Sequence, residues 1–354
     1  MLKHLKFPPL MLAALLAVGY LLAAPYLGLP SDHSLLLAGL VGIMTPAQAR
    51  VINPILTTAA QGYKHPLNVG TALFPYVPVQ QRGGSILTFG KEDFMVYNTA
   101  RAPGANTKRI EFGYASGTYA LEQHALEGKV PFELMDDARQ VPGIDMGNMA
   151  VRKVQNVIAL RLEQSQATIA TTAGSYASAN KVTLSGTGQW SDYTNGVSDP
   201  VANVDTAIAA VRAAIGLRAN TVVMGAAVWQ KLKNHPKVID RIKYTGRDVA
   251  TPELLASLFD VKQVLIGDAI SATAAGVFSD VWGKFVVVAY TDMSGIADMG
   301  SPTYGYTYRL GGYPIVEQPY EDRNAKSWIY PVTDEVSPVM ASAAAGYLIS
   351  AAVA

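Results

Sequence analysis

The amino-acid sequence predicts an α+β fold, and three observations support this prediction. Residues 145–170 carry apolar side chains at helical spacing and are the best candidate for a long helix. Between 201 and 290, short apolar runs alternate with helical patterns, which is typical of a compact α/β unit. The last third is rich in tyrosine within alternating, strand-like runs.

The long helix is expected to begin at Asp145 or Asn148, because either side chain can accept a hydrogen bond from the first turn. At ~1.5 Å per residue it would run roughly 35–40 Å, long enough to support a flat molecule. Its predicted apolar face consists of Val151, Val154, Ile158, Leu162 and Ile169.

Capping residues delimit the helices of the α/β unit. Asp199-Pro200 is typical of a helix start, and Gly216 of a helix end. Thr251-Pro252 predicts another start. The remaining predicted elements are a strand at 181–184, strands at 221–224, 261–266 and 285–290, and helices at 226–234 and 237–242 broken at Pro236.

In the last third, strands are predicted at 304–310 and 313–318, and Gly311-Gly312 between them predicts a hairpin. A further strand is predicted at 328–332, and the tyrosines are interpreted as sheet packing. By contrast, residues 63–78 contain three prolines and are predicted to be extended and irregular.

Residues 82–143 predict a long polar hairpin. Strands are expected at 85–89, 94–97 and 109–114, with turn residues at 101–106. This stretch has too few apolar residues to form a core of its own. We therefore expect it to reach a neighbouring subunit, which indicates an assembly protein before an enzyme.

Charge changes sign along this hairpin region. A solvated surface is the simpler interpretation of each charge. The alternative is a basic tip that docks on an acidic base of the next subunit, where such pairs set register and association rate more than affinity. The candidate contact residues are Lys91, Arg101, Lys108 and Arg109 on the basic side, and Glu122, Glu127, Asp136 and Asp137 on the acidic side.

Composition excludes several classes of site. The chain has 354 residues, 50% of them hydrophobic and 16% charged, with a formal net charge of +1, so no strong field for nucleic acid or membrane is indicated. It has no cysteine, which excludes disulfides and thiolate zinc sites. No phosphate loop, dinucleotide or nucleophile motif occurs, so we expect no catalytic residue, cofactor or metal. His235 beside Asp240 could form a base and its orienter, but an exposed structural histidine is the favoured interpretation.

The amino-terminal 50 residues are apolar and have three interpretations. Lys3, His4 and Lys6 precede the apolar run 10–22, and Ala47-Gln48-Ala49 follows, as in a secretory signal or membrane anchor. The segment could instead be an arm that packs on other subunits. It could also be upstream sequence before a true start at Met44.

Several segments in order resemble the major capsid proteins of tailed bacteriophages and prophages. They are RAPGANTKRIEFGY, YALEQHALEGKVP, the long helix, NHPKVIDRIKYTGR, VWGKFVVVAY and the tract from PTYGYTYRLGGYPIVEQPYEDRN to IYPVTDE. The resemblance covers roughly 51–349 and implies the tailed-phage capsid fold, with a spine helix, an extended β-hairpin loop, a peripheral domain and an inserted axial α/β domain. The apolar run 10–22 departs from the family pattern.

The resemblance implies a domain arrangement. The segment 1–50 stands apart, and 51–354 forms the capsid fold. Within it the extended loop is expected at about 82–119, the peripheral domain at about 120–200 and 301–354, and the axial domain at about 201–300.

The resemblance also implies a function. The chain would be a structural subunit that assembles with itself, as pentamers and hexamers, into an icosahedral head shell around double-stranded DNA. Portal, scaffold and decoration proteins are possible further partners. Assembly would take place in the host bacterial cytoplasm, and the product would be the virion.

Two alternatives stay open at this point. A non-viral compartment shell shares the capsid fold. A secreted or membrane-anchored α/β enzyme is suggested by the amino terminus.

Overall fold

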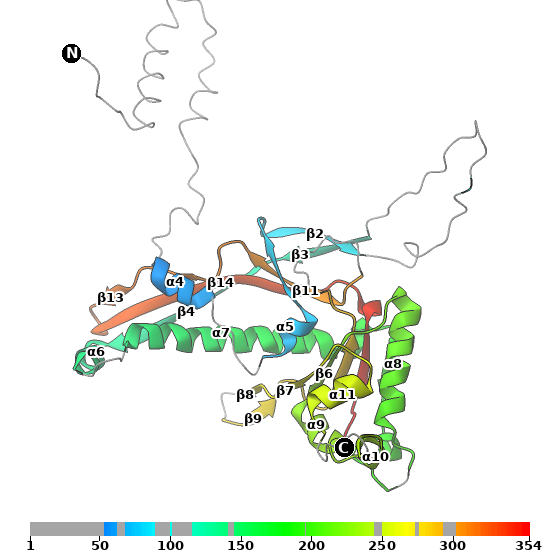
Figure 1. Cartoon of the computed structure of the whole chain (residues 1–354). Helices are drawn as coiled ribbons and strands as arrows, with labels where there is room; N and C mark the ends of the chain where they lie inside the picture. The colour runs from blue at the N-terminus through cyan, green and yellow to red at the C-terminus, as the bar shows by residue number, and fades with distance from the viewer. Residues whose placement is uncertain are drawn as a thin grey trace, which may run out of the picture. The chain divides into compact units, whose positions relative to one another are not determined.

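The fold is organised around one long strand, β14 (Ser327–Met340), with the helix α7 (Met146–Thr171) lying along it (Figure 1). The computed structural model describes residues 53–61, 68–88, 100, 115–140, 145–194, 196–243, 250–272, 276–292 and 302–354. β4 (Glu122–Pro131) pairs antiparallel with one edge of β14. The opposite edge pairs with β13 (Tyr320–Asp322), β12 (Ile315–Val316) and β11 (Gly305–Leu310), and β1 (Tyr76–Val79) adds to β11 in parallel.

The predicted hairpin at Gly311-Gly312 is wrong. β11 and β12, the strands on its two sides, do not pair with each other, because each pairs with a different stretch of β14. Ile315 lies opposite Thr333, whereas Arg309 lies opposite Val336. Two glycines allow a turn, but the partner strand decides whether the turn closes a hairpin.

The predicted long helix is confirmed as α7. Asp145 caps it, since its carboxylate accepts a hydrogen bond from the Asn148 N–H at 3.0 Å. Val151 and Val154 are buried against Val130, Tyr330 and Val332 of the sheet, together with residues of α4 (Pro54–Gln61). The apolar face therefore forms a core with the sheet, as its helical spacing predicts.

The stretch 63–78, predicted to be irregular, contains regular elements in its described part. These are the short helix α5 (Gly70–Leu73) and strand β1. The carboxylate of Glu163 on α7 holds α5 in place, since it accepts hydrogen bonds from the Val69 and Gly70 N–H groups at 3.0 Å. The Trp282 indole donates to the same carboxylate at 2.7 Å. One buried acid thus links the long helix to two distant segments. The prolines of 63–78, from which an irregular stretch was predicted, give no indication of this link.

A second sheet has five strands in the order β5-β15-β10-β6-β7. Helix α8 (Pro200–Ile215) packs on β10 and β15, while α9 (Ala226–Leu232) and α11 (Pro252–Leu258) pack near β6 and β7. Helix α10 (Pro236–Ile242) packs on α8. The strands are β5 (Lys181–Thr183), β6 (Thr221–Gly225), β7 (Gln263–Gly267), β10 (Val286–Ala289) and β15 (Gly346–Ser350).

This sheet takes strands from outside the range expected for the axial domain, about 201–300. β5 and β15 lie in the ranges assigned to the peripheral domain, yet both join the five-stranded sheet. Residues 52–354 cluster as one compact unit. The carboxy-terminal strand β15 therefore belongs to the sheet of the predicted axial domain, although its residues lie in the range predicted to be peripheral.

Two further pairs of strands form two-stranded sheets. β2 (Gly83–Thr88) pairs antiparallel with β3 (Ala115–Ala120), and of residues 89–114 between them only residue 100 lies within the described residues. The predicted strands 94–97 and 109–114 and the turn 101–106 fall in that gap. β8 (Ile270–Ala272) pairs with β9 (Phe278–Asp280) beyond the end of β7.

Candidate subunit-contact site

The predicted acidic residues lie on two consecutive elements. Glu122 and Glu127 are on β4, and Asp136 and Asp137 are on the following helix α6 (Phe132–Arg139). All four are exposed, and α6 has no buried residue. β4 pairs only with β14 among the described strands, so its second edge has no described partner strand. We call this surface, from Glu122 to Arg139, the β4–α6 surface.

Two of these acids already have partners within the chain. The Tyr320 hydroxyl donates to Glu127 at 3.1 Å, and Asp136 forms an ion pair with Arg139 at 3.0 Å. Glu122 and Asp137 make no side-chain hydrogen bond or ion pair with the described part of the chain. They are therefore the two acids best placed to interact with another molecule.

The predicted basic residues Lys91, Arg101, Lys108 and Arg109 lie outside the described residues. The structure therefore does not bring the two halves of the predicted contact together. The structure does describe β2 and β3, the paired strands that precede and follow the segment with these basic residues. We call them the base of that segment.

Sequence reasoning missed an ion pair at this base, in which the carboxylate is buried and the arginine is partly exposed. Arg82, directly before β2, donates from Nε and Nη2 to Glu335 at 2.8 and 3.1 Å. The Glu335 side chain is only 4% exposed, whereas that of Arg82 is 55% exposed. The only available signal was an acidic pair, Asp334-Glu335, in a tract of strand-forming residues. Acids inside a central strand need partners, and here each has an arginine.

Asp334 is the second member of that pair. Its Oδ2 lies 2.8 Å from Nη2 of Arg309, which also stacks over the Tyr76 ring at 4.1 Å. Burial raises the pKa of Asp334, and the charge and hydrogen bond of Arg309 offset this only in part. Asp334 and Glu335 therefore bind arginines from β11 and from the base of the β2–β3 hairpin.

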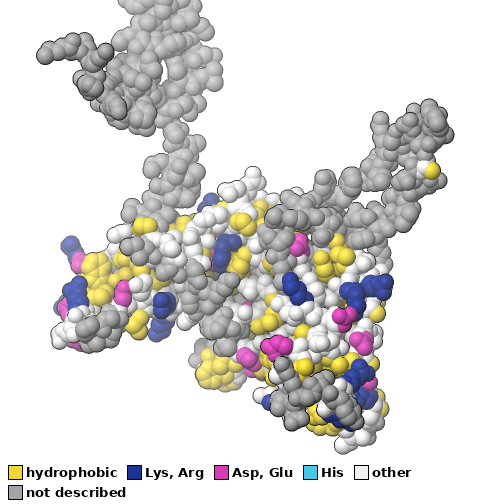
Figure 2. All heavy atoms as spheres, viewed as in Figure 1, with side chains coloured by type: hydrophobic (Ala, Val, Ile, Leu, Met, Phe, Trp, Pro, Cys, Tyr) yellow, Lys and Arg dark blue, Asp and Glu magenta, His cyan; other side chains and the backbone are white. Residues whose placement is uncertain are grey.

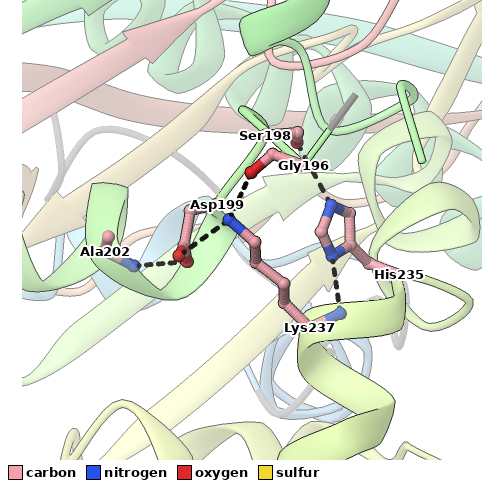
Figure 3. Close-up of polar contacts among 6 residues, drawn as sticks. All are labelled: Gly196, Ser198, Asp199, Ala202, His235 and Lys237. Carbon is pink, nitrogen blue, oxygen red and sulfur yellow. Dashed lines mark hydrogen bonds and ion pairs between the residues drawn. The ribbon is translucent and has the colours of Figure 1, made fainter. Parts of the chain in front are cut away.

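His235 has a structural role, and its predicted exposure is wrong. It is 2% exposed and caps α10, with Nδ1 accepting from the Lys237 N–H at 3.3 Å and Nε2 lying 3.1 Å from the Ser198 hydroxyl (Figure 3). Burial lowers its pKa, and the nearby Lys237 charge lowers it further. The neighbouring Asp240 pairs with Lys243 instead. His235 and Asp240 therefore do not form a base and its orienter.

The described residues offer neither a metal cluster nor a membrane-spanning helix. They contain no cluster of three or more His, Cys, Asp or Glu side chains that could hold a metal ion. None of their helices combines the length and apolarity needed to cross a membrane. The apolar run 10–22 lies outside them.

Comparison with known proteins identifies the family. Residues 118–328 match the family model of phage major capsid protein E. The major capsid protein of Burkholderia phage BcepMu is 36% identical over 308 residues, which is 86% of this chain and 97% of that protein. The chain belongs to the phage major capsid protein E family.

Solved structures agree with this assignment. A phage-related protein from Bordetella bronchiseptica RB50 is 45% identical with a TM-score of 0.74, over 86% of this chain and 98% of the other. The capsid structure of cyanophage P-SCSP1u is 9% identical with a TM-score of 0.52, over 80% of this chain and 88% of the other, and it supports the fold alone. The predicted capsid fold is confirmed.

Membership of the capsid family establishes the function at a coarse level. The protein is a structural subunit of a phage shell and associates with itself. This favours the viral shell over the compartment-shell and enzyme alternatives.

Proposed function

We propose that each subunit builds the shell by laying its 89–114 segment against the β4–α6 surface of an adjacent copy. One observation carries this proposal: on that surface, the Glu122 and Asp137 side chains are exposed and have no partner among the described residues. The segment between β2 and β3 contains Arg101, Lys108 and Arg109, which are of opposite charge. Such exposed pairs would guide encounter and register between copies.

The anchored base of the hairpin supports this arrangement. Arg82 joins β2 to the buried carboxylate of Glu335 in the central strand, and the Leu121 N–H donates to the Arg82 carbonyl at 2.8 Å. An arm that binds a neighbour must leave the subunit in a defined direction, because ordering a loose arm costs conformational entropy. The ion pair supplies that direction.

On this proposal the function is mechanical. Copies would form pentamers and hexamers that close into an icosahedral shell in the host bacterial cytoplasm and enclose double-stranded DNA. The work requires no catalytic group, cofactor or metal. Portal, scaffold and decoration proteins would bind the assembled shell.

Charge reversal on the β4–α6 surface tests the proposal. We expect the Glu122→Lys/Asp137→Lys double variant to stay folded and soluble but to form shells several-fold more slowly, measured by light scattering and negative-stain microscopy. Asp205→Lys, an exposed acid on α8, is the matched control and should assemble normally. Normal assembly of the double variant would contradict the contact.

Deletion of residues 99–108 tests the other side of the contact. The truncated chain should remain soluble and give no closed particles. Normal particles from this deletion would exclude a role for the arm. A wild-type chain that never assembles under any condition would contradict the shell function itself.

A further inference from the structure

Two exposed apolar patches lie on the part of the molecule that contains the five-stranded sheet. The first, which we call the hairpin patch, consists of Ile270, Val277 and Phe278 on and beside the β8–β9 hairpin. Phe278 is 71% exposed and Val277 is 63% exposed. Figure 2 shows hydrophobic side chains gathered over this hairpin. Contiguous exposed apolar groups of this kind mark interaction surfaces.

The second patch, the α10 patch, consists of Tyr193, Val197 and Ile239. The loop that carries Tyr193 and Val197 is fixed against α9 and α10 by several hydrogen bonds. The Tyr193 hydroxyl donates to the Lys231 carbonyl at 2.9 Å. Nζ of Lys237 donates to the Gly196 carbonyl at 2.8 Å (Figure 3). The patch is therefore a built surface with a fixed shape.

The two patches lie at different sides of the five-stranded sheet. The β8–β9 hairpin continues from β7, which is an edge strand. Helix α10 packs on α8, which covers β10 and β15. Figure 1 shows the hairpin and α10 on opposite sides of this sheet. A subunit with two unlike patches on opposite sides can bind the next copy head to tail, and repetition of that contact closes a ring.

The charges around the patches are complementary. Residues 226–243, which carry α9 and α10, contain one acid, Asp240, and five cationic residues: Lys231, Lys233, Lys237, Arg241 and Lys243. Lys237 and Lys243 pair with Asp199 and Asp240, so the excess positive charge on this side comes from Lys231, Lys233 and Arg241. Residues 268–280, which carry the hairpin, contain two acids, Asp268 and Asp280, and no cationic residue. An apolar centre with a polar rim of opposite sign on the two sides is the usual anatomy of a specific interface.

We infer that the hairpin patch of one copy binds the α10 patch of the next copy, forming a head-to-tail contact within each ring of subunits. The inference rests on the shell function and names a contact separate from the β4–α6 surface. Phe278 would be the buried anchor, because exposed aromatic side chains at the centre of an interface contribute much of the binding energy.

Cross-linking tests the contact directly, because the chain has no cysteine of its own. A Val277→Cys/Ile239→Cys double variant places the only two thiols on the two patches. After assembly and treatment with a short thiol-reactive cross-linker, it should give a ladder of covalent dimers and larger oligomers on a denaturing gel. Each single variant should stay monomeric, since a head-to-tail contact does not bring two identical positions together.

Three outcomes would overturn the inference. One is closed shells of the double variant with no ladder. Another is dimers from either single variant, which would indicate that like patches meet. The third is an equal ladder from the matched control pair Val277→Cys/Val157→Cys, whose second thiol lies at an exposed valine of α7. Shells without the ladder would leave the shell function intact, whereas a wild type that forms no shells would contradict that function instead.

Charge reversal gives an independent measurement. Asp268→Lys/Asp280→Lys should slow assembly several-fold, and adding Lys231→Glu/Lys233→Glu should restore most of the rate. If the four-residue variant assembles as slowly as the first, the charges do not meet and the pairing is wrong.

Discussion

The Arg82 guanidinium donates two hydrogen bonds to the Glu335 carboxylate, one from Nε at 2.8 Å and one from Nη2 at 3.1 Å. The pair joins the residue before β2 to the middle of β14, more than two hundred positions later in the chain. A forked contact of this kind fixes both distance and orientation. It therefore ties the start of the β2–β3 hairpin to the central strand.

The first prediction concerns this pair. Arg82→Ala should leave the buried Glu335 carboxylate with fewer donors, and β2 and β3 should separate from β14 more often. Hydrogen exchange of the β2 and β3 amides should become faster while that of α7 amides stays unchanged. Arg82→Lys is the matched control, since it retains the charge and loses the forked geometry, and its exchange should be intermediate. Unchanged exchange in Arg82→Ala would show that the pair does not hold the hairpin.

The second prediction uses the raised pKa of Asp334. Burial raises this pKa above its usual 3.8, so the folded state binds a proton at a higher pH than the unfolded state does. The stability that protonation of Asp334 contributes is fully present below the pKa of the residue in the unfolded chain. It is lost as the pH rises through the pKa of Asp334 in the folded state. Asp334→Asn removes the titration and should cost less stability at pH 7 than at pH 4. Denaturant unfolding of the unassembled subunit at both values measures this, and a larger cost at pH 7 would contradict the raised pKa.

His235 gives a third prediction, of the opposite sign. Burial lowers its pKa below 6.5, so the unfolded state binds the proton first. Its contribution to stability is present above about pH 6.5 and is lost as pH falls towards the folded pKa. His235→Asn retains a capping side chain without titrating. The midpoint of unfolding should fall less between pH 7.5 and 5.5 in this variant than in the wild type.

Gly225 is the subject of the fourth prediction. A Cβ at this position would lie 1.9 Å from the Gly283 carbonyl oxygen, and both are backbone positions with little freedom to move. Gly225→Ala should therefore destabilise the subunit by about 1–3 kcal/mol or more. Gly174→Ala is the matched control, because no atom lies within 4 Å of its Cβ. It should leave stability unchanged or raise it by about 0.4–1 kcal/mol in the same unfolding measurement.

Elements with local signals were predictable. Asp145 and Asp199 each accept a hydrogen bond from a backbone N–H in the first turn of their helix, and Gly216 ends α8 with φ at 73°. These signals act within a few residues, so the sequence contains all the information they require. The four candidate acids are exposed, as a solvated surface predicts, because a charged side chain stays hydrated unless a partner compensates its burial.

Pairings between distant segments were not predictable in the same way. Gly311-Gly312 suggested a hairpin, but β11 and β12 both pair with β14. The burial of His235 depends on Ser198 and Tyr193, which reach it from a loop before α8. A polar residue is either exposed to solvent or buried with hydrogen-bond partners, depending on which distant segment covers it. The local sequence does not reveal which segment that is.

By itself the sequence determined the long spine helix, the capped helices of the second sheet, the lack of any thiol chemistry and the expectation of an assembling subunit. Only the tertiary structure decided that β14 is the central strand, that Arg82 and Arg309 neutralise its two acids, and that apolar patches lie on opposite sides of one sheet. The physical reason is the sequence separation over which each interaction acts. Caps and helical periodicity depend on neighbours along the chain, whereas strand pairing and charge compensation depend on neighbours in space.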